Sequence, residues 1–134
     1  MRTLPLLLIG GLAASCTMGP PPPPQPIHAA QSDKAMRLLA GKVAGPPQDC
    51  ISTINANDMV WLDHSTVAFK RGSNLVYVNH FNGGCDNYAD RYALVTRQVT
   101  GQLCRGDIAQ LVDPVAHYAL GSCNFGEFIP YRRP

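Results

Sequence analysis

Cysteine is the residue type with the most chemistry to offer in this chain. It occurs at five positions: Cys16, Cys50, Cys85, Cys104 and Cys123. A cysteine thiol can form a disulfide, bind a metal ion as the thiolate or act as a nucleophile. The spacing does not suit zinc, because the chain has no Cys-x-x-Cys pair and no closely spaced pair of histidines. We therefore expect the cysteines to be points of covalent attachment.

The other polar residues form no recognisable catalytic pattern. The chain has no Gly-x-Ser-x-Gly nucleophile elbow and a single glutamate. Asp63 and His64 are adjacent, but neighbouring side chains in a strand point to opposite faces, so adjacency does not make a dyad. His80, Asp86 and Asp90 could approach a metal ion, yet we expect solvated side chains beside a Gly-Gly turn. The sequence therefore predicts no catalytic residue, no metal site and no cofactor, and we expect that the chain is not an enzyme.

The N-terminus has the layout of a secretory signal peptide. Arg2 supplies a positive charge, residues 4–12 are mostly apolar, and residues 13–15 are small. The apolar stretch is too short for a transmembrane helix, which needs about 20 residues. We therefore expect residues 1–15 to be a leader that is removed on export.

The residue after this leader resembles a lipidation site. Leu12-Ala13-Ala14-Ser15-Cys16 is similar to the lipobox of bacterial lipoproteins. The resemblance implies that Cys16 carries a diacylglycerol and an amide-linked palmitate, which together bury enough methylene groups for stable membrane anchoring. The alternative is an ordinary signal peptide with an incidental cysteine. Since Thr17 rather than aspartate follows the cysteine, the resemblance implies the outer membrane, with the chain facing the periplasm.

Residues 16–47 are predicted to hold the folded part away from the anchor. The unbroken proline run at 20–24 favours polyproline II, which extends about 3.1 Å per residue. Residues 32–41 form a short predicted helix, with Ser32 as its N-cap. We expect this helix to pack on the following domain or to be tethered loosely to it; the alternative is a basic amphipathic helix on anionic lipid. Pro46 and Pro47 then mark the domain boundary.

Residues 48–134 are predicted to form one small, mainly β domain. Six segments have the alternation or the β-branched and aromatic composition of strands: residues 59–62, 66–70, 75–81, 92–99, 108–112 and 122–129. Turn residues separate the first three, which predicts a meander. Residues 86–91 could form one turn of helix. We expect a small antiparallel sheet or a partly open barrel, in which most aromatic side chains belong to the core.

Two disulfides are expected to stabilise this domain, because so short a chain has a modest core. Cys50, Cys85, Cys104 and Cys123 form an even set, as is typical of an oxidising compartment. Four cysteines allow three pairings, and the sequence does not select one. We expect Cys85–Cys104, across a short span of loop, and Cys50–Cys123, between the ends of the domain.

Several short motifs resemble one family over roughly residues 49–130. They are Asp49-Cys50-Ile51, Leu62-Asp63-His64-Ser65-Thr66-Val67, Gly84-Cys85, Leu103-Cys104-Arg105-Gly106-Asp107 and the late Cys123. In order and spacing they are similar to a family of small uncharacterised Gram-negative lipoproteins that carry a four-cysteine β-rich domain of unknown function. The resemblance implies a place in the cell envelope and brings no activity with it.

Charge and composition limit the partners. The 11 basic and 9 acidic residues are nearly balanced, and no basic run is long enough for nucleic acid. Arg132 and Arg133 are a local excess that we expect in a frayed, solvated tail; the alternative is contact with anionic lipid or a partner. The leading hypothesis is a non-catalytic envelope lipoprotein that binds a protein or the cell wall, or serves a structural role. A carrier of a small ligand or metal, and a small envelope enzyme, are the alternatives.

Overall fold

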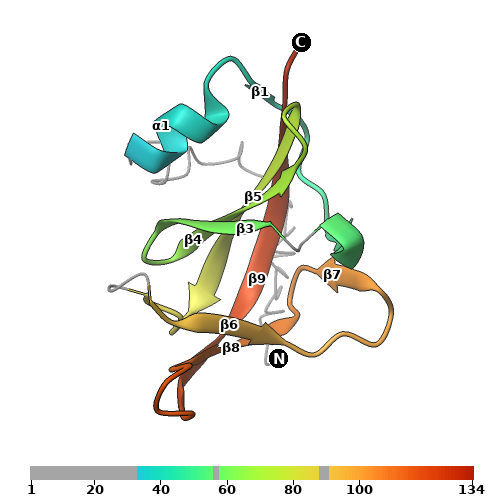
Figure 1. Ribbon diagram of the computed structural model, residues 1–134. Helices are drawn as coiled ribbons and strands as arrows, with labels where there is room; N and C mark the ends of the chain where they lie inside the picture. Colours follow the sequence, from blue (N-terminus) through green and yellow to red (C-terminus); the bar gives the residue numbers. More distant parts are fainter. Residues whose placement is uncertain (1–32, 56–57, 88–90) are drawn as a thin grey trace, which may run out of the picture.

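A computed structural model of the chain describes residues 33–55, 58–87 and 91–134 (Figure 1). The predicted leader, Cys16 and the proline run lie outside these residues, and the predicted helical turn at 86–91 lies partly outside them. Among the described residues, no helix has the length and apolar character needed to cross a bilayer.

A curled antiparallel sheet dominates the molecule, which confirms the predicted mainly β fold with a partly open barrel. Its strand order is β3-β4-β5-β9-β8-β6, and β1 pairs with the far end of β9. The strands are β1 (Val43–Ala44), β3 (Met59–Asp63), β4 (Thr66–Arg71), β5 (Leu75–Gly83), β6 (Ala93–Thr96), β8 (Ile108–Val112) and β9 (Ala119–Arg132). The longest strand, β9, pairs with β5 on one side and β8 on the other, and therefore joins the two halves of the sheet.

A second, two-stranded sheet closes the concave side. It consists of β2 (Cys50–Ser52), followed by the short 3-10 helix η2 (Thr53–Asn55), and β7 (Gln102–Cys104). Each strand has one buried apolar residue at its centre, Ile51 and Leu103, and these face each other in register. Both belong to the main core cluster, so this small sheet covers the core rather than standing apart from it.

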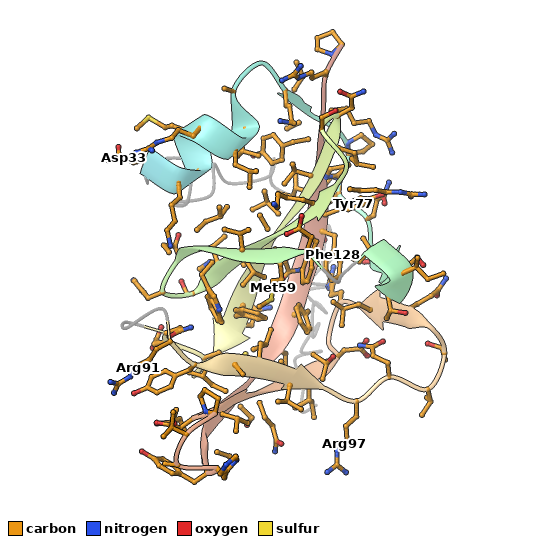
Figure 2. The ribbon with its side chains drawn as sticks, viewed as in Figure 1. Asp33, Met59, Tyr77, Arg91, Arg97 and Phe128 are labelled. Carbon is orange, nitrogen blue, oxygen red and sulfur yellow. A yellow bond between two sulfur atoms is a disulfide. The ribbon has the colours of Figure 1, made fainter. Side chains whose placement is uncertain are left out.

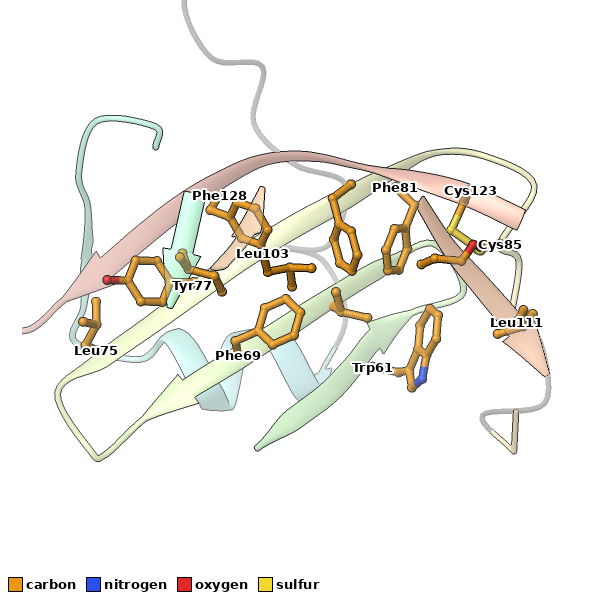
Figure 3. Packing of buried hydrophobic residues seen from close by; sticks show 14 residues of the cluster. Trp61, Phe69, Leu75, Tyr77, Phe81, Cys85, Leu103, Leu111, Cys123 and Phe128 are labelled. Carbon is orange, nitrogen blue, oxygen red and sulfur yellow. Dashed lines mark hydrogen bonds between the residues drawn. A yellow bond between two sulfur atoms is a disulfide. The ribbon is translucent and has the colours of Figure 1, made fainter. Parts of the chain in front are cut away.

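The core on the concave side is mainly aromatic (Figure 3). The ring centroids of Phe81 and Phe125 are 4.9 Å apart, and those of Phe125 and Phe128 are 5.8 Å apart. Such tilted and stacked pairs add stability beyond the area they bury. Trp61 contacts Phe81, and Phe69 contacts both Phe125 and Phe128. Most aromatic residues of the described chain therefore belong to the core, as the sequence predicts.

The helix α1 (Asp33–Leu39) lies against the convex side of the sheet (Figure 1). Ala35 is fully buried there, and Leu38 and Leu39 pack beside it. Their partners come from the β3-β4-β5 half of the sheet and from β9: Leu62, Ala68, Val76, Val78 and Tyr131. Lys42 Nζ donates a 2.7 Å hydrogen bond to the carbonyl of Leu38 and so satisfies one of the helix's terminal carbonyls. This helix does not cover the side of β6 and β8 that faces away from the core, which we call their outer side.

A β-bulge in β9 shapes the core. Asn79 pairs with Phe128 and Phe81 pairs with Phe125, so one residue of β5 faces two residues of β9. In a regular strand, residues three apart point to opposite faces. Because the bulge adds one residue, Phe125 and Phe128 both point into the core and stack on each other.

The disulfides join Cys50 to Cys104 and Cys85 to Cys123, so the predicted pairing Cys85–Cys104 and Cys50–Cys123 is wrong. Cys50 lies directly opposite Cys104 in the β2–β7 register, with their Cα atoms 4.0 Å apart. Cys123 lies opposite Gly83 at the end of β5, which places it 5.2 Å from the Cα atom of Cys85. The wrong pairing followed from missing the β2–β7 sheet.

The two disulfides are expected to differ in resistance to reduction. Cys85 and Cys123 are fully buried, whereas Cys50 and Cys104 are half-buried. Reduction requires a thiolate to reach a sulfur atom, so the accessible bridge should open first. Under native conditions with limiting reductant, we expect alkylated thiols at Cys50 and Cys104 before any at Cys85 and Cys123. Peptide mass spectrometry measures this order, and mixed pairs of alkylated sites would contradict the connectivity.

Candidate interaction surface

The outer side of β6 and β8 carries exposed apolar side chains. Along β8, Ala109 and Leu111 point into the core, and the alternation therefore turns Ile108 and Gln110 outward. Val95 of β6 pairs with Gln110 and shares this outer side. The exposed fractions are 64% for Ile108 and 44% for Val95. We call Val95, Arg97, Gly106, Asp107, Ile108 and Gln110 the outer surface.

These six residues line a pocket of about 590 Å³ that is open to solvent. Its rim includes a tight turn, in which Gly106 has a φ of 86°, a value that favours glycine. Asp107 accepts a 2.7 Å hydrogen bond from the backbone N–H of Cys104, which the disulfide connects to β2. The pocket therefore has a preformed rim, and Arg97 reaches away from the body of the protein beside it (Figure 2).

The loop between β8 and β9 extends the exposed apolar area beyond the pocket. Asp113 Oδ1 accepts hydrogen bonds of 2.8 and 2.9 Å from the N–H groups of Val115 and Ala116. These bonds to the carboxylate lower the pKa of Asp113. Within this loop, Val115 and Tyr118 are exposed. The loop therefore presents apolar groups on a defined backbone.

The order of this loop should depend on pH through Asp113. Because the pKa of Asp113 in the folded protein is lower than its ordinary value of 3.8, the carboxylate stabilises the folded loop fully when the pH is above that ordinary value. This stabilisation is lost as the pH falls through the lowered pKa. We expect the amide resonances of Val115 and Ala116 to titrate in that acidic range. In Asp113→Asn the side-chain acceptor remains but does not ionise, so the titration should disappear. A titration that survives this substitution would assign the effect to another group.

The histidines are arranged differently from what adjacency in the sequence suggests. Asp63 accepts the backbone N–H of Ser65 at 2.9 Å. His64 Nδ1 instead lies 3.2 Å from Asp86, a contact across 22 residues that sequence reasoning missed. His80 hydrogen-bonds to Thr66 at 3.0 Å. Asp90 lies outside the described residues.

Ser65 and the four domain cysteines have partners within the protein. Ser65 Oγ is directed to Asp63 at 3.4 Å, and the cysteines at 50, 85, 104 and 123 are held in disulfides. In the described ranges no three His, Cys, Asp or Glu side chains gather as a metal ion would require. The His64–Asp86 pair is about half exposed on both sides, where an ion pair contributes little.

The fold and the outer surface define a small disulfide-linked half-barrel with a partly apolar side that the described residues leave open. No protein-family model, curated protein or solved structure matches this chain. The predicted site residues therefore have to be judged on the geometry. The structure shows the four domain cysteines in disulfides. It adds the outer surface, whose signal in the sequence is the alternation of exposed and buried positions along residues 108–112.

Proposed function

We propose that this protein is a non-catalytic lipoprotein of the bacterial cell envelope, anchored to the outer membrane through Cys16. Its domain would face the periplasm and bind an envelope protein through the outer surface. The anchor is supported by the leader-like N-terminus and the lipobox-like residues before Cys16. Two disulfides in a small domain fit an oxidising compartment.

The observation that carries the binding proposal is the exposure of Ile108 and Val95 around an open pocket. On the convex side of the β3-β4-β5 half of the sheet, α1 covers the apolar residues. No described element covers those on the outer side of β6 and β8. Apolar side chains with a nearby arginine are the composition that protein interfaces favour at their centres. An open pocket suits a side chain of a protein partner better than a small ligand, which is usually enclosed.

The anchor is tested by replacing Cys16 with alanine. The wild-type protein is expected to incorporate labelled palmitate and to sediment with membranes. Cys16→Ala is expected to lose the label and the mature mass, because no thiol remains to accept the lipid. Thr17→Ala, next to the site, should retain both and serves as the control. An unlabelled wild-type protein with a free Cys16 would overturn the anchor.

The outer surface is tested by photocrosslinking in intact cells. A photoreactive residue at Gln110, in the centre of the outer surface, is expected to give one discrete protein adduct. The matched control is Gln102, which is also an exposed glutamine in a strand but lies on β7. Adding Ile108→Asp should remove the Gln110 adduct, because it places a charge in the apolar contact. Equal adducts at both positions, or an adduct that resists Ile108→Asp, would refute this surface.

A further inference from the structure

We propose that the end of the domain opposite the outer surface docks on anionic phospholipid headgroups. This end, which we call the basic end, carries Arg37, Lys42, Arg71, Arg132 and Arg133. The inference rests on the proposed lipid anchor, since a protein held at a membrane has one end beside it. It goes further by assigning which end that is and which lipid chemistry it recognises.

Separate parts of the chain bring these five cations together. Arg71 at the end of β4 and Arg132 at the end of β9 both pair with Leu75, one on each side of it. Neighbouring strands lie about 4.8 Å apart, so two strand spacings separate the backbones of the two arginines. The N–H of Arg133 donates to the carbonyl of Asn74 at 3.2 Å, which holds the C-terminus beside the β4–β5 turn. Arg132 is exposed, as expected, but it belongs to β9, so the expectation of a frayed tail is wrong for this residue.

The other two cations reach the same end from the N-terminal side. Arg37 is exposed on α1, and Lys42 follows the helix immediately before β1. Since β1 pairs with β9 at Tyr131 and Arg132, the turn that carries Lys42 adjoins the end of β9. Figure 1 shows α1, β1 and the C-terminus at the top of the molecule, and β6 and β8 at the bottom.

These cations have no carboxylate partners in the described parts of the chain. Two cations elsewhere have carboxylate partners: Lys70 lies 2.8 Å from Asp58, and Arg105 lies 2.8 Å from Glu127, whereas Arg91 contacts Tyr92. None of the five residues of the basic end makes an ion pair of this kind within residues 33–55, 58–87 and 91–134. The charges of Arg37, Arg71, Arg132 and Arg133 are therefore available to an external anion, and Lys42, whose Nζ donates to the carbonyl of Leu38, adds its charge to the same end.

The acidic residues complete a charge separation along the molecule. Of the eight acidic residues that the structure describes, six lie away from the basic end, against three basic ones, Arg91, Arg97 and Arg105. These six are Asp49, Asp63, Asp86, Asp107, Asp113 and Glu127. Of the other two, Asp33 lies on α1 next to Lys34 in the sequence, and Asp58 pairs with Lys70. An anionic surface would attract one end of such a molecule and repel the other, so the charges orient the domain as well as hold it.

Apolar side chains at the basic end favour a lipid surface. Met36 of α1 is 55% exposed and Val43 of β1 is 63% exposed, and each is next in sequence to a cation of the basic end. Exposed apolar side chains among cations are the composition of segments that rest in the headgroup region of anionic bilayers. An acidic protein would also match the charge, but it is less well placed, because the anchor would already bring this end to lipid.

The length of chain before α1 agrees with this orientation. Asp33 begins the helix and Cys16 lies 17 positions earlier (33 − 16). The predicted spacer sets the greatest distance that the domain can reach from the anchor and does not prevent contact with the membrane. Attachment keeps the domain at a high local concentration there, so that a weak ionic contact becomes populated. With the basic end on the lipid, the outer surface points toward the periplasm, where a partner can reach it.

The test uses the full acylated protein in vesicles of phosphatidylcholine, with or without phosphatidylglycerol. Amide exchange at residues 71–74 and 131–133 is expected to slow only in the anionic vesicles and to recover at high salt. Arg71→Glu/Arg132→Glu should lose this protection by on the order of tenfold or more, as expected for removing basic groups from an anionic surface. The matched control is Arg91→Glu/Arg97→Glu, which changes the net charge equally at the other end and should keep the protection.

Several outcomes would overturn the proposal. Equal protection in neutral and anionic vesicles, or equal loss in both charge-reversal variants, would show that the basic end recognises no anionic lipid. Protection produced by soluble polyglutamate but not by vesicles would assign the surface to an acidic protein. A thermal melt of Arg71→Glu/Arg132→Glu shows whether this variant is folded. Arg71→Gln/Arg132→Gln removes the same charges without reversing them and should also lose protection. The mass of the N-terminal peptide shows separately whether Cys16 is acylated. If it is not, co-sedimentation of the unacylated chain with the same vesicles tests the basic end alone: binding to the anionic vesicles only supports it, and no preference for them contradicts it.

Discussion

Replacing both Cys85 and Cys123 with alanine will lower the free energy of unfolding by about 4 kcal/mol or more. The bridge closes a loop with a sequence separation of 38, and the loop-closure entropy of the unfolded chain alone accounts for about 4 kcal/mol. Both sulfur atoms also belong to the main core cluster, so their removal adds a packing loss. Because small domains are stable by only about 5–15 kcal/mol, the variant should be close to unfolding at 37 °C.

The position of this bridge explains why its loss is not local. Cys123 lies in β9 between Gly83 of β5 and Ala109 of β8, at the place where the two halves of the sheet meet. Without the bridge, the segment that follows β5 loses its attachment to the central strand. We therefore expect the β6–β8 half, and with it the outer surface, to lose order before the half that α1 covers.

The measurement is urea unfolding followed by Trp61 fluorescence, with amide exchange to locate the loss. The control is Cys50→Ala/Cys104→Ala, which removes a bridge with a sequence separation of 54 and therefore a similar loop-closure entropy. Since Cys50 and Cys104 are only half-buried, the control should lose less packing and remain the more stable variant. A control that is equally unstable, or a core variant that unfolds like wild type, would contradict this account of the core bridge.

Strands with local signals could be predicted from the sequence. The segments at 59–62, 66–70, 75–81 and 108–112 coincide closely with β3, β4, β5 and β8, because alternation and turn residues act within a few positions. The strands β2 and β7 have three residues each and pair over about fifty positions. No local pattern distinguishes so short a strand from a loop, and their pairing is decided by tertiary packing of Ile51 and Leu103.

The disulfide connectivity depended on those missed strands. The composition indicated two bridges, but only the β2–β7 register places Cys50 opposite Cys104. The outer surface could also be predicted only in part from the sequence. Alternation along residues 108–112 marks Ile108 as facing away from Leu111, but the sequence does not show that α1 covers the other half of the sheet. The basic end is only partly visible in the sequence: the basic helix and the C-terminal arginines can be recognised there, but Arg71 and Arg132 are brought together only by pairing with β5.

The second large effect is expected at Asn79, a fully buried polar residue in β5. Its side-chain amide donates to the carbonyls of Gly126 and Glu127 at 2.9 and 3.1 Å, and its oxygen accepts from the N–H of Gly126 at 3.2 Å. These are the backbone groups that the β-bulge of β9 takes out of the regular ladder. Asn79 therefore supplies the hydrogen bonds that make the bulge tolerable inside the protein.

Asn79→Leu keeps the branched shape and the number of heavy atoms of the side chain but removes all three hydrogen bonds. A buried backbone group left without a partner costs about 1–3 kcal/mol, so we expect a loss of roughly 3 kcal/mol in the free energy of unfolding. Loss of the bulge would return Phe125 and Phe128 to opposite faces, so the aromatic core should lose its near-ultraviolet circular dichroism as well. The matched control is Asn124→Leu, at an exposed asparagine of β9 whose amide makes a single 3.4 Å contact with Gly106.

Gly126 provides an independent test of the same bulge. A Cβ atom at this position would lie 2.5 Å from the carbonyl oxygen of His80, which belongs to the backbone and has little room to move. Gly126→Ala should therefore be destabilised without losing any hydrogen-bonding group. The double variant with Asn79→Leu should lose less free energy of unfolding than the sum of the two single variants, because both act on one bulge. Additive losses in urea unfolding would show that the two residues act separately, and a neutral Asn79→Leu would show that the bulge does not need its side chain.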